Sequence, residues 1–115
     1  MSQHRIKIFE NKTQAEEEIP LGKARSMMVK GKKICVSRTS EGIFAVDDRC
    51  PHNGASLSQG YCNEKNEIIC PMHRYPFDLK SGKATSGLAM NVNTYPIEIS
   101  DDGIYVLMKA KWWEM

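Results

Sequence analysis

Two short segments, Cys50-Pro51-His52 and Cys70-Pro71-Met72-His73, stand out in this sequence of 115 residues. Each segment combines one cysteine with one histidine, and 17 residues lie between them, at positions 53–69. Thiolates together with imidazoles are ligands for zinc, iron or copper. A proline follows each cysteine and restricts the backbone there. The repeated Cys–His pair therefore predicts that the chemistry lies within residues 48–75.

The sequence on either side of these segments predicts short antiparallel strands. Runs rich in Ile and Val are separated by turns that contain glycine, such as Ser81-Gly82 and Asp101-Asp102-Gly103. The expected strands are residues 6–9, 26–29, 33–38, 43–47, 67–69, 77–79, 95–99 and 104–107. No stretch shows sustained helical periodicity, and residues 11–19 are expected to form a loop or one helical turn. The predicted class is all-β, a small antiparallel sandwich or barrel.

Composition excludes several classes of protein. The length fits a single domain over residues 1–115. The net charge is only +2 and the basic residues are scattered, so nucleic-acid binding is not expected. No apolar run approaches the roughly 20 residues of a membrane span, and residues 1–10 lack the apolar core of a secretory signal. We therefore expect a cytoplasmic protein without membrane association, in which cysteine and histidine bind a metal or take part in redox chemistry.

The distribution of the four candidate ligands favours a two-iron site. Zinc fingers usually pair two cysteines in one half of the motif and two histidines in the other. Here each half contains both residue types, which suits a [2Fe-2S] cluster with two cysteines on one iron and two histidines on the other. The predicted ligands of one such cluster per chain are Cys50, His52, Cys70 and His73. Cys35 is expected to pack in the core, and Cys62 to be a bystander.

Residues beyond the ligands extend the pattern, and together they resemble the Rieske-type ferredoxins. The first loop continues to Ala55, with Leu57 and Gly60 beyond it, and the second is followed by Phe77-Asp78 and Gly82. The similarity covers roughly residues 34–107. It implies a small antiparallel β fold, with a cluster-binding subdomain at about residues 47–84.

Two departures from the high-potential members of this family concern the surroundings of the cluster. Ala55 and Met72 stand where those members have the cysteines of a bridging disulfide. Tyr75 and Phe77 stand where they have serine and tyrosine hydroxyls near the cluster. Hydrogen bonds to the cluster sulfurs influence the reduction potential, so we expect the low end of the Rieske range, on the order of −150 mV.

The resemblance implies an electron carrier that is not itself an enzyme. It would pass single electrons from a reductase to a terminal oxygenase or another reductase. The partner is expected to dock at the histidine edges of the cluster, on a face that includes Leu57 and Tyr75. Apart from the two cluster histidines only His4 remains, too few for an oxygenase iron site. The alternatives are a small Rieske-like subunit of a nitrite reductase and a zinc-stabilised interaction module.

Overall fold

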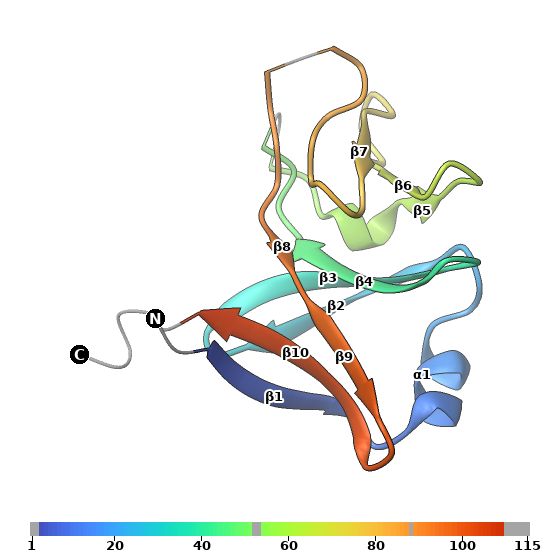
Figure 1. The fold of residues 1–115 in the computed structure, drawn as a ribbon. Helices are drawn as coiled ribbons and strands as arrows, with labels where there is room; N and C mark the ends of the chain where they lie inside the picture. Colours follow the sequence, from blue (N-terminus) through green and yellow to red (C-terminus); the bar gives the residue numbers. More distant parts are fainter. Residues whose placement is uncertain (1–2, 52–53, 88, 110–115) are drawn as a thin grey trace.

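Strands dominate the computed structural model, which describes residues 3–51, 54–87 and 89–109 (Figure 1). The elements are β1 (Gln3–Phe9), α1 (Lys12–Glu18), β2 (Ala24–Val29), β3 (Lys32–Thr39), β4 (Gly42–Asp47), the 3-10 helix η1 (Leu57–Gln59), β5 (Tyr61–Cys62), β6 (Glu67–Ile69), β7 (Pro76–Asp78), β8 (Thr94–Tyr95), β9 (Ile97–Ser100) and β10 (Gly103–Lys109). Neither described helix is long and apolar enough to cross a membrane.

The strands form three antiparallel sheets with the orders β1-β10-β9, β2-β3-β4-β8 and β5-β6-β7. In the first sheet Ile6 pairs with Val106, so strands from the two ends of the chain lie side by side. Figure 1 shows the β5-β6-β7 sheet at one end of the molecule and the β1-β10-β9 sheet at the other. The predicted all-β class is confirmed. The barrel alternative is not formed, because the three sheets stay separate over the described residues.

The strand β3, inside the β2-β3-β4-β8 sheet, is buried on both faces. Ile34 and Val36 of β3 belong to one core cluster, together with residues of β1 and β10. Cys35, which points to the opposite face of the same strand, belongs to a second cluster with Cys50 and Cys70. Strands covered on both faces have continuous apolar runs, as residues 34–36 do. One face of this sheet thus carries the main core, and the other supports the two cysteine segments.

Two local features set the order of the strands. Lys30 and Gly31 have positive φ angles of 52° and 77° and link β2 to β3 in a two-residue hairpin. Pro96, which has no N–H to donate, separates β8 from β9. The chain changes sheets at this proline, since β8 pairs with β4 whereas β9 pairs with β10. The single strand expected at residues 95–99 is therefore two strands in two sheets.

The helix α1 is longer than the single turn that we expected. Its seven residues begin after Asn11, whose side chain accepts a hydrogen bond from the Gln14 N–H at 2.7 Å. Ala15 and Ile19, at helical spacing, are buried against the main core. Two apolar positions are too few to reveal a helical period in the sequence, whereas packing against the core is enough to stabilise two turns.

Candidate metal centre

The first cysteine loop, residues 49–56, follows β4 and is closed by backbone hydrogen bonds. Cys50 donates its N–H to the Ala55 carbonyl at 2.8 Å, and Gly54 donates its N–H to the Cys50 carbonyl at 2.8 Å. Gly54 has φ +78°, a conformation that side chains disfavour. These bonds hold Cys50 in the second core cluster with 1% of its surface exposed. The predicted ligand His52 lies outside the described residues.

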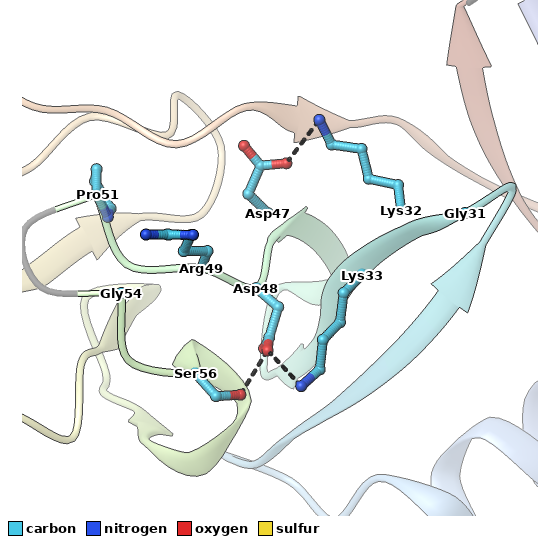
Figure 2. Close-up of a pocket in the computed structure, with 9 residues that line it drawn as sticks. All are labelled: Gly31, Lys32, Lys33, Asp47, Asp48, Arg49, Pro51, Gly54 and Ser56. Atoms are coloured by element: carbon cyan, nitrogen blue, oxygen red, sulfur yellow. Dashed lines mark hydrogen bonds and ion pairs between the residues drawn. The ribbon is translucent and has the colours of Figure 1, made fainter.

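Asp48 fixes the base of the first cysteine loop from inside the protein. Its carboxylate is buried and accepts hydrogen bonds from Ser56 Oγ at 2.5 Å and from the Ser58 N–H at 2.9 Å. Lys33 Nζ lies 3.6 Å from the same carboxylate (Figure 2). The backbone carbonyl of Asp48 accepts from the Leu57 N–H at 2.7 Å. The end of the loop and the start of η1 are thus tied to Asp48, the residue that follows β4, a detail that the sequence did not indicate.

The second cysteine loop, residues 70–75, joins β6 to β7. Cys70 is fully buried and donates its N–H to the Tyr75 carbonyl at 2.9 Å. His73 and Arg74 both have left-handed backbones, with φ angles of 64° and 55°. Two consecutive residues of this kind without glycine are uncommon, and such strain tends to gather at functional sites. The turn leaves His73 exposed, with its ring edge-on to Tyr75 at 6.2 Å between centroids.

The two loops are brought together by η1 and the β5-β6-β7 sheet. Leu57 begins η1 directly after the first loop, and Ile69 ends β6 directly before Cys70. Between them the backbone of Gly60 passes so close to Ile69 that an added Cβ would lie 1.8 Å from the Ile69 carbonyl oxygen. Only glycine permits this approach. Cys50 and Cys70, 20 positions apart by their residue numbers, consequently share one buried cluster.

The donor set has a buried and an exposed part. Two thiols lie inside, and the described imidazole of His73 lies at the surface. Among the described residues no three His, Cys, Asp or Glu side chains gather closely enough to hold a single metal ion. A two-iron cluster needs only two protein ligands on each iron, so its four ligands do not have to meet at one point. Two buried thiols together with the surface imidazole of His73 fit such a group.

The remaining cysteines, Cys35 and Cys62, form no disulfide and lie outside the two cysteine loops. Burial raises the pKa of the Cys35 thiol to about 12. Burial also raises the pKa of the half-buried Cys62 thiol, whose sulfur lies 3.9 Å from the Lys23 carbonyl oxygen. A thiolate is the form that binds metal, and a raised pKa disfavours it. Both cysteines therefore have the environment expected of packing residues.

Part of the expected docking face is wrong. Leu57 is 0% exposed and packs in the second core cluster, so it cannot contact a partner. Tyr75 is half-buried and remains available, whereas Phe77 is completely buried. Met72, in the middle of the second cysteine segment, has 51% of its surface exposed. The sequence identified these residues as apolar, but only the packing separates the buried Leu57 from the exposed Met72.

Comparison with known proteins connects this arrangement to a family. Residues 10–96 match the Rieske [2Fe-2S] domain. The chain is 38% identical over 96 residues to the 3-phenylpropionate/cinnamic acid dioxygenase ferredoxin subunit of Photorhabdus laumondii. The aligned region covers 83% of this chain and 90% of that protein.

Two solved structures have the same fold. One is the ferredoxin of carbazole 1,9a-dioxygenase from Nocardioides aromaticivorans, with a TM-score of 0.76 and 24% identity over 95% of this chain and 100% of that one. The other is described as a putative NADH-dependent nitrite reductase small subunit from Mycobacterium tuberculosis, with a TM-score of 0.82 and 19% identity over 96% of this chain and 100% of that one. The predicted family and its [2Fe-2S] cofactor are confirmed: the chain belongs to the Rieske [2Fe-2S] domain family, among its ferredoxins.

Proposed function

We propose that the chain is a one-electron carrier that serves the terminal oxygenase of an oxygenase system. One observation carries this proposal: the buried thiols of Cys50 and Cys70 share one core cluster, and the exposed imidazole of His73 belongs to the same loop as Cys70. A bound [2Fe-2S] cluster would store one electron there. The relative from Photorhabdus laumondii is itself named as the ferredoxin subunit of a dioxygenase, which supports an oxygenase as the partner.

The four proposed ligands are Cys50, His52, Cys70 and His73, and each pair has its own role. The two cysteine thiolates offset the two positive charges of an oxidised cluster core, while neutral imidazoles add no charge. A site without net charge accepts an electron more easily than one with four thiolates. The imidazole of His73 faces solvent, so the electron would leave by that edge toward a docked partner.

The proposed partners are a reductase that delivers the electron and a terminal oxygenase that receives it. The alternative, a small subunit of a nitrite-reductase-like enzyme, has support only from the shared fold. The two differ in assembly, because a subunit would co-purify with its large partner and a carrier would not. We also propose a cytoplasmic location, because that compartment keeps cysteines such as Cys35, which forms no disulfide, in the reduced state.

The proposed domain limits follow from the sheets. Residues 1–115 would form one domain, because β1 at the start of the described chain pairs with β10 at its end. The proposed cluster-binding subdomain, about residues 47–84, contains both cysteine loops and the β5-β6-β7 sheet.

Electron paramagnetic resonance of the dithionite-reduced protein tests the proposed ligands. We expect a Rieske-type signal from the wild type and from Cys62→Ser, since the Cys62 sulfur lies beside the Lys23 carbonyl and is not a proposed ligand. Cys70→Ser should lose the signal, because it removes a thiolate that holds iron. Metal analysis of the same samples should find iron and not zinc.

The reverse pattern, in which Cys62→Ser loses the signal and Cys70→Ser keeps it, would refute the ligand assignment. A protein that contains zinc and gives no signal would instead be the interaction module of the zinc alternative.

A further inference from the structure

A charged pocket of about 620 Å³ borders the first cysteine loop (Figure 2). It lies between this loop and the hairpin that joins β2 to β3, with Pro51 and Gly54 on one side and Gly31 on the other. The charged residues that line it are Lys32, Lys33, Asp47, Asp48 and Arg49. We call it the Lys33–Arg49 pocket. Its position next to Cys50 makes it part of the surface that a redox partner would cover.

Both carboxylates of the pocket are already engaged within the protein. Asp47 accepts hydrogen bonds from the Tyr95 hydroxyl at 2.6 Å and from the Asn93 N–H at 3.1 Å. Asp48 is bonded to the residues at the base of the first cysteine loop and has only 3% of its side chain exposed. Their negative charge is therefore directed inward.

The cations of the pocket are partly exposed, and Arg49 adds a positive charge beyond the two lysine ion pairs. The Lys32 and Lys33 ammonium groups form ion pairs of 3.8 and 3.6 Å with the Asp47 and Asp48 carboxylates, and 39% and 55% of the two lysine side chains remain exposed. Arg49 is exposed, and no carboxylate within the described part of the chain forms an ion pair with it. Its guanidinium group lies beside Gly54, where an added Cβ would be 3.5 Å from one of its terminal nitrogens. The rim of the pocket is thus more positive than its floor.

We propose that the Lys33–Arg49 pocket receives an acidic side chain of the redox partner, an inference that rests on the proposed electron-carrier function. The Arg49 guanidinium is planar and matches a carboxylate in two parallel hydrogen bonds. The Lys33 ammonium adds a second positive charge on the opposite wall. A Glu or Asp side chain held between them would fix the orientation of the partner against the first cysteine loop. Charge complementarity of this kind mainly accelerates association.

Electron transfer to two haem proteins of opposite charge tests the pocket. The dithionite-reduced holoprotein is mixed in a stopped-flow instrument with cytochrome b5, which is acidic, and with cytochrome c, which is basic. Arg49→Gln and Lys33→Gln are compared with Lys23→Gln, which also removes one exposed charge. Lys23 lies just before β2, at the end of that strand away from the pocket hairpin.

At low ionic strength we expect Arg49→Gln to slow the reduction of cytochrome b5 roughly fivefold, the factor for one contact between unit charges in water. Lys33→Gln should act in the same direction, and Lys23→Gln should change the rate less than twofold. Reduction of cytochrome c should become faster in the two pocket variants. A change in reduction potential would instead shift both reactions in the same direction, so the two acceptors separate docking from driving force.

Two results would overturn the inference. The first concerns the pocket alone, and the second also concerns the electron-carrier function. If both haem proteins are reduced and the pocket variants behave like Lys23→Gln, the pocket does not take part in docking, while the electron-carrier function stands. If the holoprotein reduces neither acceptor, the electron-carrier function fails and the role of the pocket fails with it.

Discussion

Asp48 is the residue that connects the sheet to the first cysteine loop. It combines near-complete burial with hydrogen bonds to a hydroxyl and a backbone N–H that lie eight and ten positions further along the chain. A buried charge is costly unless such partners compensate it. Asp48 therefore favours one arrangement of the loop over others, and the position of Cys50 depends on it.

Replacement of Asp48 by alanine should destabilise the protein because it leaves the Ser58 N–H without its acceptor and the Ser56 hydroxyl with only the Ser58 hydroxyl as a partner. The expected loss is about 1–3 kcal/mol in the free energy of unfolding. Asp48→Asn keeps one acceptor oxygen and should lose less. Urea denaturation of the holoprotein measures both. The control Glu17→Ala, on the exposed side of α1, should leave the free energy of unfolding nearly unchanged; an equal loss there would show that Asp48 has no special role.

At the scale of elements, the short strand β8 is tied to β4 mainly through Asp47 and Tyr95. The two strands share only two residue pairs, Ala45 with Tyr95 and Val46 with Thr94. The Tyr95 hydroxyl adds its hydrogen bond to the Asp47 carboxylate. Burial, together with this bond and the nearby negative charge, raises the pKa of Tyr95 above the ordinary tyrosine value.

This raised pKa predicts how stability depends on alkaline pH. Below about pH 10, the ordinary pKa of tyrosine, the hydroxyl is protonated in both the folded and the unfolded state. Above it the unfolded state releases the proton first, so the contribution of Tyr95 is lost as the pH rises toward its folded pKa. Thermal unfolding followed from pH 8 to 11 should show a shallower decline for Tyr95→Phe than for the wild type. Tyr61→Phe, at an exposed position, should follow the wild type; identical profiles for all three would contradict the prediction.

At the scale of the molecule, the described residues form two cores, and we expect these to depend differently on the cofactor. The main core lies between the β1-β10-β9 and β2-β3-β4-β8 sheets and includes none of the three described residues proposed as ligands, Cys50, Cys70 and His73. The second core lies on the other face of the β2-β3-β4-β8 sheet and includes both Cys50 and Cys70. A ligand stabilises the state to which it binds, and here that stabilisation acts first on the second core.

Removal of the cluster should loosen the second core and leave the main core folded. In the chelator-treated protein we expect faster hydrogen exchange at the amides of Cys50 and Cys70, whose bonds close the two cysteine loops. The amides of β1 and β10 should stay protected, because their pairing depends on the main core. Exchange mass spectrometry of the holoprotein and the apoprotein makes the comparison. Uniform acceleration over all sheets would indicate a single cooperative unit instead.

The local parts of this protein were predictable from its sequence. The cysteine and histidine segments indicate their chemistry by residue type and spacing, and the Rieske family that they indicate is confirmed. Most strands also lie where the apolar runs and glycine turns place them, as β6 does at residues 67–69. Both signals depend on residues close together in the chain, and a sequence displays such neighbours directly.

The tertiary structure alone decided which distant residues meet. Local sequence patterns did not predict three such features: the pairing of Ile6 with Val106, the burial of Leu57, and the pocket between Lys33 and Arg49. An apolar residue such as Leu57 fits a core or a docking surface equally well, and a scattered lysine shows no partner. Such contacts arise only when the sheets pack and burial assigns each side chain to the interior or the surface. The sequence by itself therefore determined what chemistry the site can do, and packing determined which surface presents it.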